Sequence, residues 1–325
     1  MKNNHNLTLT DVTTARRRIA PYIVETPVIR AHKLEPLFNG AEIYLKLENL
    51  QCTGSFKVRG VANKMLNLSP EELKRGVTAA SSGNHAQAVS YVSSRLGVDA
   101  CIVMPVNAPV SKVEGTRGYG AEVVLCGYTG EDRDQKCQEL IRERGYSLVH
   151  SHMDPHVITG HGTVALEVYE QLRGCFDEIV FPCGAGSLTS GGALAMKLLD
   201  DTITVTAVEP AEVPRFTESC KAGQAVTVQM GQTIADGLRV SKAEVINYDL
   251  IAGNVDHLLT VDEDSIARAV KEVVTKAKIV AEPSACVGIA AALAGRIDTA
   301  VGRKIVFVIS GGNIDPSMLA DLVNR

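Results

Sequence analysis

The segment from Thr53 to Gly60, which reads TGSFKVRG, has the most distinctive chemistry in the chain. Its lysine, Lys57, follows an aromatic residue, Phe56, and stands where a helix is predicted to begin. An apolar, β-rich run over residues 43–48 comes just before the segment. Desolvation, or positive charge close by, lowers the pKa of a lysine amine and makes it a nucleophile. The segment therefore predicts either a reactive lysine or an ordinary amphipathic lysine lying along a helix face.

A second segment, SSGNHAQ over residues 81–87, lies between a predicted strand at 77–80 and a helix expected to begin near His85. In open α/β sheets, ligands bind beyond the carboxyl ends of strands, and helix N-termini offer free N–H groups to anions. Small hydroxylated residues and glycine let a substrate carboxylate approach the backbone closely. The segment predicts a carboxylate site or, alternatively, a plain capped turn.

Two further segments follow strand-like runs later in the chain. PCGAGSLTSGG over residues 182–192 is a glycine-rich turn of the kind that builds an anion nest from backbone N–H groups. It ends in no G-K-[ST] and does not match G-x-G-x-x-G, so it favours a phosphate monoester over a nucleotide. ISGGN over residues 309–313 ends the last predicted strand, where the hydroxyl of Ser310 would meet a ligand heteroatom.

These segments are separated by short apolar runs that alternate with helical patterns. Such alternation is typical of parallel sheets covered by helices on both faces. We expect an α/β fold with two domains: a large one over residues 1–65 and 150–325, and a small inserted one over 66–149. Besides those above, strands are predicted at 100–104, 121–125, 178–181, 204–208 and 304–309, and helices near Val110 and over 131–144 and 262–277.

Composition narrows the class of partner. The 325 residues are 45% apolar and 22% charged, with a net charge of −4, which disfavours nucleic acid or an anionic membrane as a partner. We find no apolar run long enough to span a bilayer and no signal-peptide pattern, and we expect a cytoplasmic protein that acts on a small molecule. The eight cysteines form no C-x-x-C pair, so we expect reduced thiols.

The four segments, in this order over nearly the whole chain, resemble the fold type II pyridoxal-phosphate enzymes, which have a fold like the tryptophan synthase β-subunit. The similarity is greatest to the serine/threonine dehydratase and serine racemase group. Glu48, residues 234–238 (IADGL) and residues 282–284 (EPS) are further matches. The resemblance implies pyridoxal 5′-phosphate as the cofactor, an amino acid as the substrate, and a homodimer or homotetramer.

The resemblance also implies a role for each matching residue. Lys57 would form the internal Schiff base and carry the Cα proton, and Phe56 would flank the pyridine ring. Asn84 would hydrogen-bond the ring hydroxyl oxygen, and Ser310 would meet the ring nitrogen. The substrate carboxylate would bind the backbone of Ser81, Ser82, Gly83, Asn84 and His85, and the phosphate would bind Gly184, Ala185, Gly186, Ser187 and Leu188.

A neutral serine at the ring nitrogen leaves the ring a weaker electron sink, which suits α,β-elimination of a β leaving group. The function implied is that of a threonine/serine dehydratase, an ammonia-lyase giving a 2-oxo acid and ammonia. Alternatives are a serine racemase, with Ser82 as the second acid/base group, or a 3-hydroxyaspartate dehydratase. A pyridoxal-phosphate-binding protein that has lost catalysis is a further alternative, although the intact Lys57 argues against it.

The chain departs from the family pattern at three places. Ala185 and Ser187 replace glycines of the phosphate loop, which puts the loop geometry in question. Arg215 stands where some relatives carry a second metal-binding carboxylate, so we expect it to pair with Glu209 and expect no divalent metal. His161 replaces a common glutamine. We interpret the histidines His150, His152, His156 and His161 as surface or satisfied core residues.

Overall fold

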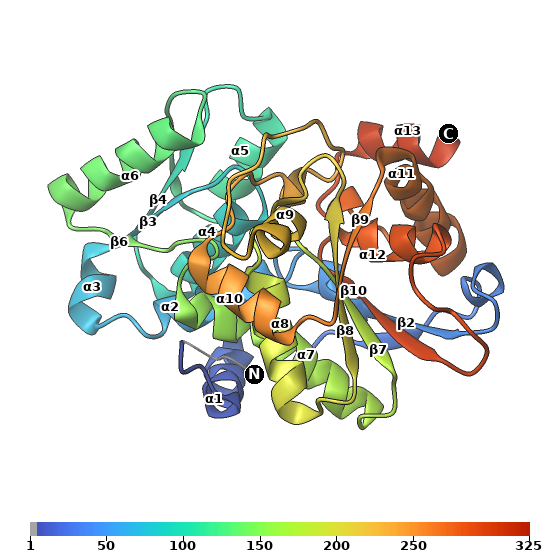
Figure 1. Cartoon of the computed structure of the whole chain (residues 1–325). Helices are drawn as coiled ribbons and strands as arrows, with labels where there is room; N and C mark the ends of the chain where they lie inside the picture. Colours follow the sequence, from blue (N-terminus) through green and yellow to red (C-terminus); the bar gives the residue numbers. More distant parts are fainter. Residues whose placement is uncertain (1–4) are drawn as a thin grey trace.

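The computed structural model describes residues 5–325, which form two β-sheets flanked by helices (Figure 1). The larger sheet has the strand order β1-β2-β10-β7-β8-β9. Only β1 runs antiparallel to its neighbour; the other pairings are parallel. The strands are β1 (Val28–Arg30), β2 (Glu42–Leu47), β7 (Glu178–Pro182), β8 (Thr204–Pro210), β9 (His257–Val261) and β10 (Lys304–Ile309).

The smaller sheet is parallel throughout and has the order β5-β4-β3-β6. Its strands come from one continuous stretch of chain, and in Figure 1 it lies on the left with α3 to α6 around it. They are β3 (Val77–Ala80), β4 (Ala100–Met104), β5 (Glu122–Leu125) and β6 (Ser147–Leu148).

Helices connect the strands of both sheets. The first six are α1 (Leu9–Ile19), α2 (Lys57–Met65), α3 (Pro70–Arg75), α4 (Asn84–Leu96), α5 (Val110–Arg117) and α6 (Gly130–Arg144). The others are α7 (Pro155–Leu172), α8 (Ser187–Leu199), α9 (Arg215–Ala222), α10 (Val245–Asn254), α11 (Glu263–Glu272), α12 (Pro283–Leu293) and α13 (Pro316–Asn324). A π-helical turn (Val273–Ala277) extends α11, and 3-10 turns include η4 (Asp236–Leu238).

The strand sequences explain why helices cover both faces of the larger sheet. Side chains alternate between the two faces of a strand. In β10, Ile305, Phe307 and Ile309 pack in the core cluster that includes α11 and α12. Val306 and Val308 pack in the cluster on the other face, with α7 and α8. Because both faces are buried, the strand is apolar from Ile305 to Ile309, as the sequence predicted for a parallel sheet.

Four buried charged residues join α2 to β2 and α7; we call them the ion cluster (Lys46, Glu48, Arg59 and Glu167). Arg59 lies 2.7 Å from Glu48 and 2.6 Å from Glu167, and Lys46 lies 2.6 Å from Glu167. All four side chains are at most 1% exposed. Two cations and two anions leave the cluster neutral. Arg59 therefore ties the first turn of α2, which begins at Lys57, to the larger sheet.

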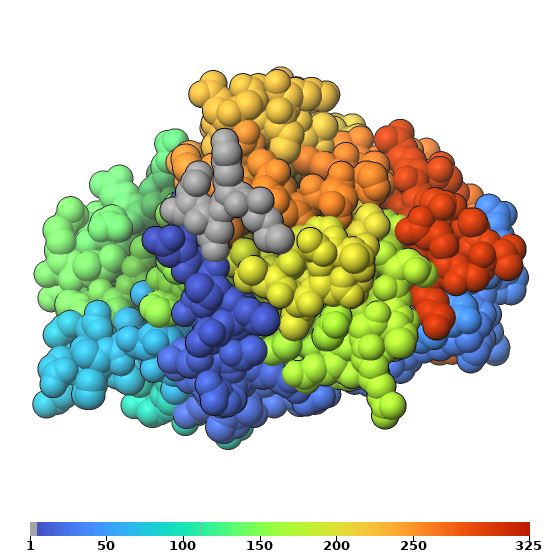
Figure 2. Space-filling view, turned by 60° about the horizontal axis from the view of Figure 1, so that its bottom comes forward, coloured from blue at the N-terminus to red at the C-terminus, as the bar shows by residue number. Residues whose placement is uncertain are grey.

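The first helix, α1, contributes Ile19 to the core cluster that contains β3 and β4, and Val12 to the cluster that contains α7 and α8. It packs against α7, α2 and α8. In the face shown in Figure 2, the dark-blue residues around α1 lie between the cyan and green residues of the smaller sheet's region and the yellow residues around α8. No helix in the described residues is long and apolar enough to cross a membrane.

Most predicted elements are present at or near the predicted residues. Strands at 77–80, 100–104 and 304–309 agree to the residue, and the predicted helix at 262–277 is α11 with its π-helical turn. The sequence analysis missed β1, β6 and β9. Two of them, β1 and β6, are only three and two residues long, and β9 is at most half-buried over most of its length, so their apolar patterns are weak.

Candidate active site

The turn that carries Lys57 docks against the end of β10. The backbone N–H of Phe56 donates to the carbonyl of Ser310 at 3.0 Å, and Gly312 donates to Gly54 at 2.9 Å. Ser55 and Gly311 form an isolated antiparallel bridge. Two segments about 250 residues apart in sequence thus meet at the carboxyl edge of the larger sheet, where ligands bind in open α/β folds.

Lys57 is the first residue of α2 and is partly buried. Its Nζ lies 3.5 Å from the carbonyl oxygen of Ser151 and 4.9 Å from the centroid of the Phe56 ring. Among the described residues, no carboxylate is within ion-pair distance of this amine. Burial lowers the pKa of Lys57 to about 8, and the charge of Glu282 only partly opposes this. These features favour a reactive amine over a solvated helix-face lysine.

Asn84 joins the segment after β3 to the larger sheet. Its Nδ2 donates to Glu282 Oε1 at 2.9 Å, and its Oδ1 accepts from Asn313 at 2.8 Å. Glu282 is 5% exposed, and burial raises its pKa to about 8. A Cβ at Gly311 would lie 2.4 Å from Glu282 Oε1, so a side chain there would displace the Glu282 carboxyl. The carboxyl of Glu282 thus lies among the residues assigned to the site.

Glu282 is the functional candidate that the sequence reasoning missed, since it was noted only as part of a matching tripeptide. The available signal was its position: a carboxylate directly before Pro283 and the almost wholly apolar helix α12. A charged residue that leads into a buried helix has to be paired or protonated, and such residues gather at functional sites.

The connection between β3 and α4 holds the residues assigned to the substrate carboxylate. Ser81, Ser82 and Gly83 are partly buried there, and the N–H of Gly83 donates to Ser81 Oγ at 3.3 Å. His85 Nε2 lies 2.8 Å from the carbonyl oxygen of Val149. Burial lowers the pKa of His85 to about 3, so its ring is neutral at physiological pH.

The glycine-rich segment forms the turn between β7 and α8. Gly186 has a φ of +99° and a Cβ there would lie 2.7 Å from the Phe216 ring, so glycine is required. Neither Ala185 nor Ser187 has a positive φ, so the loop accepts both side chains without backbone strain. No hydrogen bond to a protein acceptor uses the N–H groups of residues 184–187 in the described part of the chain. These free donors at the start of a helix suit an anion. Buried Leu188 follows in the first turn of α8.

His161 links this loop to the lysine turn. Its Nδ1 lies 3.1 Å from Ser187 Oγ, and its ring meets the Phe56 ring edge-on with centroids 4.6 Å apart. The side chain is fully buried, and burial lowers its pKa well below the usual value. His161 is therefore a neutral residue of the core. Its Nε2 is buried and has no hydrogen-bond partner among the described residues, so His161 is not the satisfied core histidine that the sequence analysis expected.

Glu209 and Arg215 are not paired as the sequence analysis expected. Glu209 accepts hydrogen bonds from the backbone N–H groups of Phe216 and Thr217, at 3.0 and 2.9 Å. Within residues 5–325, Arg215 has no carboxylate oxygen within 4.0 Å, and its hydrogen bonds go to backbone carbonyls. The expected ion pair is wrong because α9 begins at Arg215, and the free N–H groups at its N-terminus bind the carboxylate of Glu209. The described residues include no group of three or more His, Cys, Asp or Glu side chains placed to hold a metal. That the protein binds no divalent metal stays a prediction.

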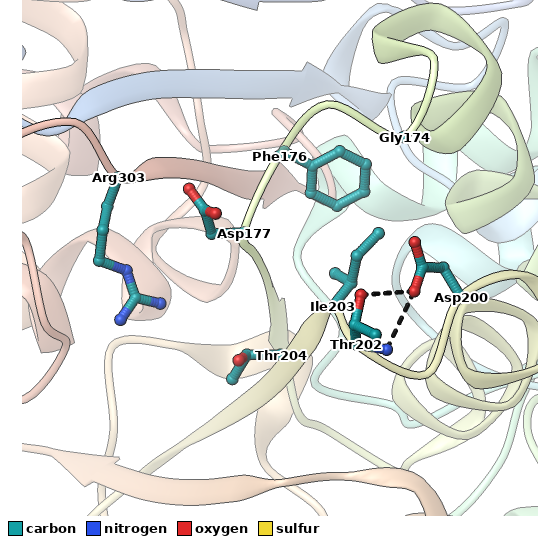
Figure 3. Close-up of a pocket in the computed structure, with 8 residues that line it drawn as sticks. All are labelled: Gly174, Phe176, Asp177, Asp200, Thr202, Ile203, Thr204 and Arg303. Carbon is teal, nitrogen blue, oxygen red and sulfur yellow. Dashed lines mark hydrogen bonds between the residues drawn. The ribbon is translucent and has the colours of Figure 1, made fainter.

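A cavity of about 410 Å³ lies at the opposite, amino edge of the larger sheet (Figure 3). Asp200 accepts hydrogen bonds from the N–H and hydroxyl of Thr202, and Arg303 pairs with Asp298 and Glu178. Its polar groups thus bond mainly to protein partners, and it holds none of the predicted site residues. The lining residues are Gly174, Phe176, Asp177, Asp200, Thr202, Ile203, Thr204 and Arg303.

Comparison with known proteins identifies the class of protein. The family model described as "Pyridoxal-phosphate dependent enzyme" matches residues 19–311. The chain therefore belongs to the pyridoxal-phosphate-dependent enzymes, and pyridoxal phosphate is its cofactor.

Within this family, the chain is similar to several individual proteins of known name. The chain is 40% identical to an L-threonine ammonia-lyase of Thermotoga maritima, over 98% of this chain and 79% of that protein. It is 38% identical to an L-threo-3-hydroxyaspartate ammonia-lyase of Saccharomyces cerevisiae, over 97% and 95%. Its fold matches maize serine racemase with a TM-score of 0.93 at 34% identity, covering 98% and 97% of the two chains. The expected fold type II architecture is confirmed.

Proposed function

We propose that this enzyme is a threonine/serine dehydratase, a lyase that converts a β-hydroxy amino acid into a 2-oxo acid and ammonia. The observation that carries the proposal is the partly buried Lys57 amine, with its pKa lowered to about 8, at the point where the four segments meet. The curated relatives in threonine breakdown support L-threonine as the first substrate to test, with L-serine second.

The residues present fit the cofactor. The free N–H groups of residues 184–187 would hold its phosphate, and Lys57 would bond its aldehyde carbon. Phe56 would lie beside its ring and Asn84 near its ring hydroxyl, while buried Ser310 offers a neutral partner for the ring nitrogen. When bound, pyridoxal phosphate withdraws electrons from the Cα of the substrate and so weakens the bonds to it.

Lys57 has the properties of the base in this reaction. An amine with a pKa of about 8 holds and releases a proton close to neutral pH, as general acid–base catalysis requires. It would remove the Cα proton, while the backbone of Ser81 to His85 holds the substrate carboxylate. The β-hydroxyl would then leave with its bonding electrons and take up the proton that Lys57 removed, so that the elimination releases one water. Asn84, braced by Glu282 and Asn313, would keep the ring in place during this step.

A second function is favoured by the similarity to serine racemases. Racemisation needs an acid/base group on the face of Cα opposite Lys57, and Ser82, partly buried in the loop after β3, is the candidate. The yeast relative supports 3-hydroxyaspartate as a further substrate. Comparing the chirality of recovered serine with the 2-oxo acid formed separates racemase from lyase activity.

We further propose that residues 66–149 form a small domain inserted into a large domain of residues 1–65 and 150–325. The ion pair between Lys112 on α5 and Asp236 in η4, at 2.8 Å, then joins the two domains across the site. A homodimer or homotetramer is proposed from the family alone. A cytoplasmic location is consistent with the eight free cysteines.

The proposal is tested by assaying 2-oxo acid formation with L-threonine, L-serine and L-threo-3-hydroxyaspartate. We expect turnover of at least one of them, and loss of at least about 10³-fold in the Lys57→Ala variant, because a general base contributes about 10²–10⁴-fold. Absence of turnover on the whole panel, with the cofactor bound to Lys57, would instead favour a binding protein that has lost catalysis.

A further inference from the structure

We propose that Arg215 is a positioning residue for the phosphate loop, residues 183–188: its guanidinium binds the loop carbonyls, aims the loop N–H groups at the phosphate and supplies positive charge beneath them. This inference rests on the proposed cofactor site. Nothing in the comparisons assigns a role to this residue.

The contacts of Arg215 are unusual for a buried arginine. The side chain is fully buried, and every hydrogen bond it makes goes to a backbone carbonyl. Its Nη2 donates to Cys183 at 3.1 Å and, with Nε at 3.0 Å, to Gly184. Its Nη1 donates to Leu238 at 3.1 Å and to Val240 at 2.6 Å. One guanidinium thus joins the phosphate loop to Leu238, at the end of η4, and to Val240, just after it.

These bonds dictate where the loop N–H groups point. In a trans peptide unit, the carbonyl and the N–H of the next residue point in opposite directions. The carbonyls of Cys183 and Gly184 point towards Arg215, so the N–H groups of Gly184 and Ala185 point away from it. Those two groups are among the donors that have no protein acceptor in the described residues. The guanidinium therefore holds the free donors in one direction before any anion is bound.

The charge of Arg215 is not cancelled by direct contact. An arginine stays protonated in proteins, even though burial lowers the pKa of this one. Glu209 is near enough to attract it but lies beyond ion-pair distance, and its carboxylate is occupied by the N–H groups of Phe216 and Thr217. A buried cation in a low-dielectric site acts strongly on a nearby anion. The dianionic phosphate is the natural recipient.

The neighbouring residues keep the guanidinium in this position. Arg215 is the first residue of α9, and Glu209 holds the next two N–H groups of that helix. The Phe216 ring packs against Gly186, where a Cβ would lie 2.7 Å from it, and the guanidinium carbon lies 5.5 Å from the centroid of the ring. The first turn of α9 thus contacts the loop at the carbonyls of Cys183 and Gly184, through Arg215, and at Gly186, through Phe216.

The test compares pyridoxamine 5′-phosphate with pyridoxamine as ligands of the apoprotein. Neither forms a bond to Lys57, so the ratio of their dissociation constants reports the phosphate contacts alone. The wild type should bind the phosphorylated ligand at least about tenfold more tightly. Arg215→Gln, which removes the charge, should reduce that ratio at least about tenfold, the effect of one charge-assisted hydrogen bond. Arg215→Lys keeps the charge but cannot reach both sets of carbonyls. Its ratio of the two dissociation constants should therefore fall about three- to tenfold.

The matched control is Arg303→Lys, at the opposite edge of the sheet, which should leave the ratio unchanged. Circular dichroism and thermal melts identify the folded variants, and Arg215→Lys, the more conservative one, provides the test if Arg215→Gln does not fold. Ratios within about twofold of the wild type in the folded Arg215 variants would overturn the proposal and leave Arg215 a core residue only. Absence of any preference for the phosphorylated ligand in the wild type would overturn the cofactor site itself, and the inference with it.

Discussion

Two fully buried arginines, Arg59 and Arg215, differ in what holds them. Arg59 in the ion cluster bonds the carboxylates of Glu48 and Glu167, which raise its pKa although burial opposes them. Among residues 5–325, the Arg215 side chain donates hydrogen bonds only to carbonyls, and burial lowers its pKa. Both lie next to the proposed site. Arg59 comes two residues after Lys57 in the sequence, and Arg215 contacts the phosphate loop in space.

The difference separates two uses of a buried charge. A cation that is neutralised by carboxylates has little field left for a ligand, and it serves to join elements of the scaffold. A cation that is held by neutral dipoles keeps its charge for an anion that binds later. We therefore assign Arg59 to the support of α2 and Arg215 to the recognition of phosphate. Substituting either arginine tests this distinction.

The largest effect on stability is expected from Arg59→Met. The change leaves Glu48 and Glu167 buried with only Lys46 as a cation, so the free energy of unfolding should fall by about 3–5 kcal/mol. Urea unfolding of the apoprotein measures it. The ratio of pyridoxamine phosphate to pyridoxamine affinity should not change in the folded fraction. A loss below about 1 kcal/mol would show that the cluster does not support the fold.

Arg215→Met should cost less stability than Arg59→Met but change phosphate binding more. It leaves carbonyls with unmade hydrogen bonds rather than uncompensated charges, and it removes a desolvated cation, so we expect a loss of about 1–3 kcal/mol in the same urea experiment. If Arg215→Met destabilised the protein more than Arg59→Met, the distinction between the two arginines would be lost.

Acid should destabilise the apoprotein through its buried histidines. Burial lowers the pKa values of His161 and His85, so below pH 6.5 the unfolded chain binds protons that the folded chain does not. The contribution of each histidine to stability then falls as the pH falls, by up to about 1.4 kcal/mol per pH unit. The raised pKa of Glu282 acts in the opposite direction over this range, so the histidines are tested by the difference between variants. His161→Gln should reduce this slope, and His156, exposed on the same helix, provides the matched control. Urea unfolding between pH 7 and 4 measures both variants. An unchanged slope in His161→Gln would contradict a neutral, buried His161.

The smallest effect is expected from metal removal. Arg215 occupies the region beside Glu209 with a fixed cation, so a chelator should change neither the melting temperature nor the affinity for pyridoxamine phosphate. Adding Mg²⁺ or Ca²⁺ back should be equally without effect. A rise in melting temperature with either ion would show that a divalent metal binds, and a rise lost in Glu209→Gln would place it beside Arg215.

The local structures that the sequence predicted well are those with a local sequence signal. The start of α2 at Lys57 and the glycine-rich turn that leads into α8 each come after a strand, and an apolar run and a glycine pattern reveal them. Glu282 and Arg215 gain their meaning from distant partners: Asn84 lies 198 residues from the first, and Gly184 lies 31 residues from the second. The pairing of Glu209 with Arg215 was expected from the metal site of some relatives, and it is wrong because the start of α9 directs the two side chains to different backbone groups.

The most direct test of the central claim is to reduce the purified holoenzyme with borohydride and map the labelled peptide. The account predicts that the cofactor is fixed to the Nζ of Lys57, in the peptide that contains TGSFKVRG, and that the Lys57→Ala protein carries no such label. Cofactor fixed to any other lysine, or full label in the Lys57→Ala protein, would contradict the assignment of Lys57 and the site built around it.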